Sequence, residues 1–312
     1  MTEKNNVTVY IVFPVHNRIE ETKKFLASLA RQTVTNYRLV ICDDGSTDGT
    51  GEYLAKNCPD VVIVKGTGQL WWTAGINRCI EYVLSCCDQN DYVLTLNNDV
   101  SLPPEYLQQK LARAKDNPDA IIGSLCVYAD NTDIIETSGY IINYDKCSSD
   151  RLTKPGELRN EQHKGLAEVT HLPGKGVLLP VKLFREVGLY DEVGLPQYHA
   201  DTDLVLRAHD MGYRVYVDFD SVVLSEINTN NMVLPTQEIT LKGIVKTFIG
   251  PYSMNNFRVY NNFARKHFPG KRLKFLAIIY VKTISGLAKR YIKYKLGTGG
   301  GSTRGSAEKP GN

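Results

Sequence analysis

Several features that would assign a chain to a particular class are missing from these 312 residues. None of the seven cysteines forms a Cys-x-x-Cys pair. Their odd number and scattered positions predict reduced, mostly buried thiols, and neither disulfides nor a zinc site. No stretch approaches eighteen uninterrupted apolar residues, so we expect no membrane-spanning helix. The first residues, MTEKNN, are polar and lead straight into an apolar run, so we expect no signal peptide and a cytoplasmic location.

Acidic residues are absent from a long stretch near the C-terminus. Residues 1–238 hold 22 Lys and Arg against 33 Asp and Glu, whereas residues 239–307 hold 14 Lys and Arg and no acid. Helical spacing places Tyr280, Ile284, Leu287 and Tyr291 on one face and Lys282, Lys289 and Lys293 on another. We predict that residues 239–296 form a basic, amphipathic helical extension that lies on an anionic membrane, at the inner face of the cell membrane.

A second interpretation of this extension is a helix packed against the rest of the chain, with its basic face in solvent. Nucleic-acid binding is not expected, because the basic region carries no recognition motif. Residues 297–312 are rich in glycine and serine, and we interpret them as a flexible tail outside the fold.

Apolar runs of strand length alternate with segments of helical spacing in the first half of the chain. The expected strands are Val7–Pro14, Tyr37–Cys42, Val61–Val64, Tyr92–Leu96 and Ala120–Val127. The expected helices are Glu20–Gln32, Gly51–Asn57, Ala74–Ser85 and Pro104–Lys115. This alternation predicts an α/β domain over residues 1–238, with a mostly parallel sheet and helices on both faces.

The alternation breaks from Asp130 onward. The polar stretch Asp145–Leu166 is expected to be a mobile loop, and His199–Gly212 is expected to be helical from about Thr202. Two further strands are expected, Arg214–Asp218 and Ser221–Leu224.

Polar clusters follow three of the expected strands. They are Val15-His16-Asn17, Asp43-Asp44-Gly45-Ser46 and Asn97-Asn98-Asp99. In a parallel sheet the ligand binds at the carboxyl ends of the strands, so these clusters are expected to share one edge. Turn chemistry could explain any one of them, but it does not explain why all three fall at the same edge.

Asp99 closes a buried strand, where a carboxylate would otherwise be costly. One interpretation is that Asp99 binds Mg²⁺ or Mn²⁺ bridging a diphosphate, with Asn97 as a neutral polar contact, because these cations take oxygen ligands. The other is a strand-end turn that caps the next helix. The residues alone favour neither.

A turn does not need two adjacent acids. Asp43 and Asp44 could instead accept hydrogen bonds from a pyrimidine N–H or from ribose hydroxyls. A glycine turn with Asp48 as a helix cap is the alternative, and we assign Asp48 to that role. Further along, Asp201 and Asp203 stand at a helix entrance. We interpret Asp201 as a general base for a hydroxyl and Asp203 as an i,i+4 partner of Arg207.

Two weaker signals remain. Lys175 lies between Gly174 and Gly176, which would let its backbone approach a ligand closely while the ammonium meets a phosphate or a sugar. The pair Trp71-Trp72 could form an apolar platform for a sugar ring, although a core position for at least one of them is the simpler expectation.

Together these segments resemble the family-2 inverting glycosyltransferases of GT-A fold, over roughly residues 7–225. The resemblance is carried by Phe13–Asn17, Val40–Thr50, Leu70–Asn77, Leu94–Asp99, Leu172–Gly176, Phe184–Asp191 and Ala200–Leu204. It implies a Rossmann-like GT-A catalytic domain, a nucleotide-sugar donor, a divalent metal (Mg or Mn) bound through Asp99, and Asp201 as the catalytic base. The implied donor-binding residues are Pro14, His16, Asn17, Asp43, Asp44, Trp72, Asn77, Asn97, Asn98 and Lys175.

Two positions depart from this family's pattern. Ala200 stands where many members have an acid before the base, and Ser225 stands near a position where many have a metal-binding histidine. The resemblance is greatest to bacterial enzymes of surface polysaccharide synthesis, including rhamnosyltransferases. It implies transfer of rhamnose or another hexose from a TDP- or UDP-sugar to a growing, often lipid-linked glycan. The alternatives are a nucleotidyltransferase that makes nucleotide-sugars and a non-catalytic glycan- or nucleotide-binding protein.

Overall fold

The computed structural model describes residues 7–226, 240–250 and 253–296, which fall into two compact units, one before residue 230 and one after it. Each unit is described here by itself. The domain boundary that we predicted between residues 238 and 239, and the tail 297–312, lie outside the described residues.

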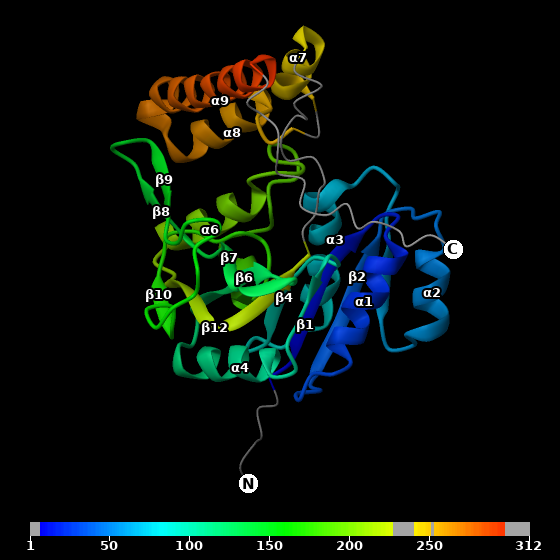
Figure 1. The fold of residues 1–312 in the computed structure, drawn as a ribbon. Coiled ribbons are helices and arrows are strands. Elements are labelled where there is room, and N and C mark those ends of the chain that lie inside the picture. The colour runs from blue at the N-terminus through cyan, green and yellow to red at the C-terminus, as the bar shows by residue number, and fades with distance from the viewer. Residues whose placement is uncertain (1–6, 227–239, 251–252, 297–312) are drawn as a thin grey trace, which may run out of the picture. The chain divides into compact units, whose positions relative to one another are not determined.

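A single large sheet organises the first unit (Figure 1). Six strands run in one direction: β1 (Val9–Val15), β2 (Tyr37–Asp43), β3 (Val62–Lys65), β4 (Tyr92–Thr95), β6 (Ile121–Tyr128) and β12 (Val215–Ser225). Four run against them: β5 (Val100–Ser101), β7 (Asn131–Thr137), β10 (Leu166–Glu168) and β11 (Val177–Pro180). The main order is β10-β12-β6-β11-β4-β1-β2-β3, so β11 is an antiparallel strand inserted between β4 and β6.

Helices cover both faces of this sheet (Figure 1). They are α1 (Ile19–Leu29), α2 (Thr50–Asn57), α3 (Trp71–Cys86), α4 (Tyr106–Asp116), α5 (Val181–Glu186) and α6 (Ala200–Asp210). Phe25 of α1 meets Phe13 of β1 edge-on, with ring centroids 5.1 Å apart. The next residue, Pro14, points to the other face, where a Cβ on Gly75 of α3 would lie only 2.6 Å from the proline Cβ. Successive side chains of β1 thus pack against helices on opposite faces of the sheet.

Two details near the end of the first unit differ from the predictions. Helix α6 begins at Ala200, two residues before the expected start. The two strands expected near the end of the first unit are one strand, β12, with a register shift between Asp218 and Val222. The buried Asp218 carboxylate accepts from the Ser221 hydroxyl at this shift, which satisfies the polar groups there without ending the strand.

The polar stretch that we expected to be a mobile loop also contains regular structure. Strand β9 (Ser148–Arg151) pairs antiparallel with β8 (Tyr140–Asn143). An isolated bridge joins Ile134 to Leu158 further along the stretch. The prediction of a plain loop is therefore wrong for its first part. Backbone pairing formed the strand although its residues are polar.

The second unit is helical, as predicted, with α7 (Leu241–Ile249), α8 (Phe257–His267) and α9 (Arg272–Lys295). Aromatic rings hold α8 to α9; Phe275 stacks on Phe268 at 4.4 Å between centroids, and Phe257 stacks on Tyr280 at 5.7 Å. Tyr280 is therefore turned into the unit, whereas Ile284 is exposed, so the apolar face that we predicted from these residues is split. Within the described residues, no helix is long and apolar enough to cross a membrane.

Candidate active site

The polar clusters meet at one edge of the sheet, here called the rim. It comprises residues 15–17 at the end of β1, 43–46 at the end of β2, 97–99 after β4, Ser225 at the end of β12 and 173–176 before β11. Because β11 runs against its neighbours, the beginning of this strand lies where the other strands end. Short pairing of β5 with β12 sets Val100 opposite Ser225, which brings Asp99 next to the end of β12.

Backbone strain is concentrated in loops of the rim and of the helices beside it. Three residues other than glycine have left-handed backbone there: Asn17 (φ 51°), Trp71 (φ 64°) and His199 (φ 67°). Such conformations cost of order 1–3 kcal/mol each and persist where the surrounding structure imposes them, often at functional sites. Their positions beside α1, α3 and α6 support this edge as the functional one.

The loops after β1 and β2 are joined by side-chain hydrogen bonds. Asn17 Oδ1 accepts from the Thr47 backbone N–H at 2.7 Å, and the His16 ring bonds the Asp44 carbonyl at 2.6 Å. Both His16 and Asn17 are exposed, so they can also meet a ligand at the rim. Pro14, predicted with them, is half-buried against α3.

Asp48 behaves as the capping residue that we predicted, but for two helices. Its carboxylate accepts from the backbone N–H of Ile19, the first residue of α1, at 2.9 Å. It also accepts from the N–H and the hydroxyl of Thr50, the first residue of α2. One side chain therefore satisfies the free amides of two helix N-termini.

The two adjacent acids after β2 have different surroundings. Asp43 is half-buried and accepts from the Ser46 N–H at 3.0 Å, which leaves it able to contact a ligand. Asp44 is only 6% exposed, and its two oxygens accept from the N–H groups of Gly68 (2.6 Å) and Leu70 (2.8 Å). The Asp44 carboxylate therefore holds the loop before α3, and its contact with the donor stays a prediction.

Trp72 and Asn97, both predicted to bind the donor, are brought together directly. The indole N–H of Trp72 donates to Asn97 Oδ1 at 3.1 Å, and the indole packs edge-on against Tyr190 at 5.5 Å between centroids. A Cβ on Gly174 would lie 3.3 Å from both Trp72 Cζ2 and Asp201 Oδ2. The indole edge and the Asp201 carboxylate therefore line the same small region around Gly174.

Asp201 and Asp203 separate as predicted into two environments. Asp201 is partly exposed, and its oxygens accept from the N–H groups of Gly174 and Thr202, both at 2.8 Å. Asp203 is fully buried and pairs with Arg207 at 2.9 Å. Burial, and next the charge of Asp201, raise the pKa of the Tyr190 phenol.

Asp99 is the one acid of its cluster, and its side chain is 17% exposed. Among the residues that the structure describes, no three acids, histidines or cysteines gather as a metal cage. Arg18 lies 3.9 Å from Asp99 Oδ2. A hard cation usually takes one or two carboxylates and completes its shell with substrate phosphates and water. A single carboxylate, that of Asp99, therefore fits a Mg²⁺ or Mn²⁺ ion that is shared with a diphosphate. It does not fit a metal cage that the protein forms alone.

Lys175 is directed to the end of β12. Its ammonium donates to Glu136 at 3.0 Å and to the Ser225 hydroxyl at 2.9 Å. Burial lowers the pKa of Lys175, but the negative charges of Glu136 and, among the weaker contributors, Asp99 outweigh it, so the pKa is raised and the lysine is charged. A fixed positive charge thus stands at Ser225, the residue that pairs with Val100.

Two predicted donor-binding residues have structural partners. Asn77 is 2% exposed, and its amide donates to the Tyr190 carbonyl while its oxygen accepts from the Tyr190 N–H. Asn98 is 7% exposed and donates to Thr22 of α1 at 2.9 Å. Through these contacts each residue fastens a helix to the region around the rim, and its contact with the donor stays a prediction.

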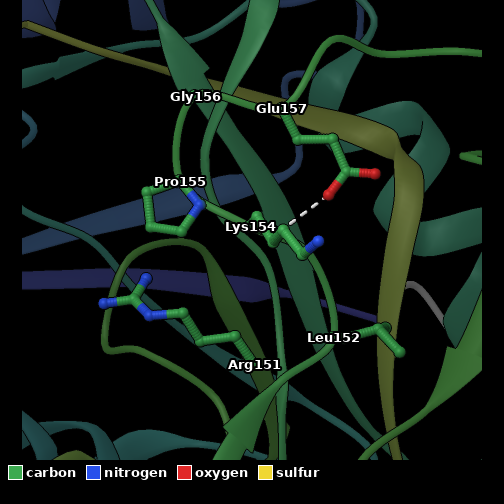
Figure 2. Close-up of a pocket in the computed structure, with 6 residues that line it drawn as sticks. All are labelled: Arg151, Leu152, Lys154, Pro155, Gly156 and Glu157. Atoms are coloured by element: carbon green, nitrogen blue, oxygen red, sulfur yellow. Dashed lines mark hydrogen bonds between the residues drawn. The ribbon is translucent and has the colours of Figure 1, made fainter.

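A separate hollow of about 640 Å³ lies outside the rim. Figure 2 shows its lining, which the end of β9 and the turn after it provide: Arg151, Leu152, Lys154, Pro155, Gly156 and Glu157. None of the predicted site residues lines it. This hollow therefore does not coincide with the convergence of chemical groups at the rim.

Sequence reasoning missed three residues of the site. Arg18 directly follows the first polar cluster, and this position was its available signal. Tyr190 falls within a segment that carried the family resemblance, yet was not selected. Glu136 lies in β7, whose sequence gave no hint of the pairing with Lys175, 39 residues away.

Comparison with known proteins gives the family. Residues 10–188, more than half of the chain, match the family described as Glycosyl transferase family 2. The chain belongs to glycosyl transferase family 2. This confirms the resemblance drawn from the strand-end motifs. The matched residues of this family 2 chain include β1 to β11 and Lys175, and they end before Asp201.

Relatives of this family 2 chain include proteins of glycan synthesis. The succinoglycan biosynthesis protein ExoA of Rhizobium meliloti (strain 1021) is 24% identical over 220 residues, 69% of this chain and 62% of the relative. The undecaprenyl-phosphate 4-deoxy-4-formamido-L-arabinose transferase of Proteus mirabilis (strain HI4320) is 28% identical over 124 residues, 36% of this chain and 35% of the relative. The chain thus spans less than two thirds of each.

Solved structures of glycosyltransferases share the fold. GalNAc-T7 with UDP, GalNAc and Mn²⁺ has a TM-score of 0.58 and 16% identity, covering 85% of this chain and 51% of that one. The mannosyltransferase PcManGT from Pyrobaculum calidifontis, in complex with GDP-Man and Mn²⁺, has a TM-score of 0.53 and 15% identity, covering 95% and 76%. At these identities the likeness shows the fold alone, and it confirms the predicted GT-A fold.

Proposed function

We propose that the chain is an inverting glycosyltransferase of the hexosyltransferase class, acting in bacterial surface polysaccharide synthesis. It moves rhamnose or another hexose from a TDP- or UDP-sugar to a hydroxyl of a growing, lipid-linked glycan. The observation that carries the proposal is the meeting of Asp201 and Trp72 around Gly174, with Asn97 bonded to the indole. Membership of family 2 and relatives named for succinoglycan and undecaprenyl-phosphate chemistry support it.

In this mechanism Asp201 takes the proton of the acceptor hydroxyl. The hydroxyl oxygen forms a bond to the anomeric carbon as the bond from that carbon to the diphosphate oxygen breaks on the opposite face. The nucleoside diphosphate leaves with the electron pair. Trp72, backed by Tyr190, offers an apolar surface to the sugar ring, and its bond to Asn97 fixes the indole.

Asp99 would hold Mg²⁺ or Mn²⁺ together with the donor's phosphates. When bound, the cation neutralises charge on the leaving diphosphate. On the nucleoside side, His16, Asn17 and Asp43 are the exposed or half-exposed groups that could meet base and ribose.

The products of a donor assay separate this proposal from its alternatives. Incubation of the full chain with a panel of nucleotide-sugars and Mn²⁺ should release nucleoside diphosphate. Release of pyrophosphate from a nucleoside triphosphate and a sugar 1-phosphate would instead favour a nucleotidyltransferase. Absence of either product, with nucleotide still bound, would favour a binding protein and contradict our proposal.

Asp201→Asn tests the assignment of the base. Asparagine keeps the size and hydrogen bonding of the side chain but cannot accept the proton, so transfer should fall by about 10²–10⁴-fold while donor affinity survives. Asp203→Asn is the matched control on the same helix. Its expected effect is lower stability, because it breaks a buried pair with Arg207. Normal transfer by Asp201→Asn and loss of transfer in a folded Asp203→Asn would reverse the two roles.

We further propose that α9 attaches the protein to the cytoplasmic face of the membrane. Along its exposed side lie large apolar residues, among them Leu273 (81% exposed) and Val281 (67%). Exposed lysines of α9 stand at 282 and 289, a spacing that places them along one helical edge. An apolar face bordered by lysines, in a stretch with no acid from residue 239 to 307, suits an anionic lipid surface.

Vesicle co-sedimentation tests this attachment. The full chain should bind phosphatidylglycerol vesicles at low salt, and added salt should weaken binding because it screens the attraction. Val281→Ser with Ile284→Ser should reduce binding through the lost apolar contact, whereas Val193→Ser, an exposed valine outside α9, should not. Equal sedimentation with and without vesicles at low salt would contradict the proposal.

A further inference from the structure

The loop before β11 carries the charged group whose use the mechanism above leaves open. Lys175 has a side chain that is only 18% exposed, and its ammonium contacts Glu136 and Ser225. Long surface lysines are usually mobile and solvated, but this one is held within the rim by two partners from β7 and β12.

The neighbours of Lys175 fix its position. The Gly174 N–H donates to Asp201, the proposed base, at 2.8 Å. Gly176 has φ +75°; its N–H donates to the Thr95 carbonyl at 2.9 Å and its carbonyl accepts from Ser124 at 2.7 Å. The loop is thus bonded on both sides of the lysine, so the ammonium does not depend on a flexible backbone for its placement.

Two cations lie in the surroundings of Asp99. Lys175 bonds Ser225, which pairs with Val100, the residue next to Asp99. Arg18 lies 3.9 Å from the Asp99 carboxylate. The charge of Asp99 is also among the influences that raise the pKa of Lys175, which places the two groups within electrostatic reach. A diphosphate bound at Asp99 would therefore lie within reach of the Lys175 charge.

We propose that Lys175 binds the diphosphate of the donor, and that Glu136 holds the ammonium in place until the diphosphate takes it over. The proposal rests on the glycosyltransferase function above, and it assigns Lys175, which the family resemblance implied as donor-binding, to the diphosphate and Glu136 to its placement. Both phosphates of the donor carry negative charge, and so does Asp99, the acid at this point of the rim. Asp99 by itself therefore does not attract the diphosphate, and a positive group is needed. A lysine is a point charge suited to phosphate, and hydrogen bonds between charged groups are about twice as strong as neutral ones. Lys175 therefore supplies positive charge whether or not a divalent cation is present.

Calorimetric titration of the full chain with UDP and with TDP tests this binding. Each titration is made in Mn²⁺ and again in excess EDTA. Lys175→Met should weaken binding of the preferred nucleotide by roughly tenfold to a hundredfold in both buffers, the range expected for a lost charged hydrogen bond. The relative loss should be larger in EDTA, where no other cation compensates. Glu136→Gln should tighten binding several-fold, because the ammonium no longer has a charged competitor.

Two controls make the outcome decisive. The double variant Lys175→Met with Glu136→Gln leaves no unpaired charge, so it keeps the fold if the single variant does not, and it should bind as weakly. Lys164→Met removes an exposed lysine that is paired with Glu161, and it should bind like the wild type. Thermal melting checks that each variant is folded.

Affinities equal to wild type for Lys175→Met and the double variant, in both buffers, would overturn the role of Lys175 and leave the glycosyltransferase proposal standing. A wild-type chain that binds neither UDP nor TDP, with or without Mn²⁺, would overturn the donor assignment itself and this role with it.

Discussion

Replacing Lys110 by methionine tests how the core of the first unit accommodates a charge. Lys110 lies on α4 with no exposed surface, and its ammonium donates to the backbone carbonyls of Ile122 and Gly123. Burial lowers the pKa of Lys110 to about 7, and the charge of Asp218 opposes this shift only in part. The free energy of unfolding should therefore depend on pH through this one side chain.

The sign follows from proton binding. An unfolded lysine keeps its proton up to about pH 10.4. Between about pH 7 and that value, the unfolded chain binds one more proton at this residue than the folded chain does. Stability from Lys110 therefore rises with pH in this window, by about 1.4 kcal/mol per unit, and is lowest below pH 7. Lys110→Met lacks this dependence, so its stability relative to wild type should fall by about 2 kcal/mol between pH 7.5 and pH 9.

Urea unfolding followed by tryptophan fluorescence measures this difference. Both tryptophans of the chain, Trp71 and Trp72, belong to the same unit as Lys110, so the signal reports the relevant transition. Lys164→Met, at an exposed lysine, is the control, and its difference from wild type should stay level with pH. A Lys110→Met difference that is equally constant from pH 7.5 to 9 would show that Lys110 stays charged in the fold and refute the argument from burial.

Two further outcomes concern the rim. Wild-type turnover should rise with added Mn²⁺ or Mg²⁺, and Asp99→Ala should abolish that rise while thermal melting shows an intact fold; undiminished wild-type turnover in excess EDTA would contradict this. Gly176→Ala should destabilise the fold by about 1–3 kcal/mol in urea unfolding, because its φ is +75° and its Cβ would lie 2.6 Å from the Ser124 and Tyr106 oxygens. Gly188→Ala, at φ +88° with open space around it, should cost less, and an equal cost at both sites would assign the loss to φ alone.

The sheet and the placement of its polar clusters could be predicted because both depend on local pattern. The β1 strand is almost wholly buried and is followed at once by the exposed His16 and Asn17, so the change from apolar to polar marks the strand end. The insertion of β11 could not be predicted in the same way. Its four residues form a short apolar run, and periodicity does not tell whether such a run joins the sheet parallel or antiparallel.

The partners of individual site residues depended on contacts that sequence does not display. The sequence predicted Asp44 as a ligand-binding acid beside Asp43, but it did not show that the two Asp44 oxygens accept from amides 24 and 26 residues further along. Asn77 bonds a residue 113 positions away. By contrast, the roles of Asp203 and Arg207 were predictable because i,i+4 spacing on a helix fixes their distance.

The inserted strand β11 also has a consequence for the order in which the chain is completed during synthesis. Its neighbours β4 and β6 both precede it in sequence, and β6 ends at Tyr128, whereas β11 begins at Val177. Until Val177–Pro180 leave the ribosome, β4 and β6 cannot take their final spacing, and each presents an unpaired edge. At about 5–20 residues per second, the intervening roughly 50 residues keep those edges open for several seconds. A nascent chain halted in this interval should therefore be a target for chaperones or for aggregation.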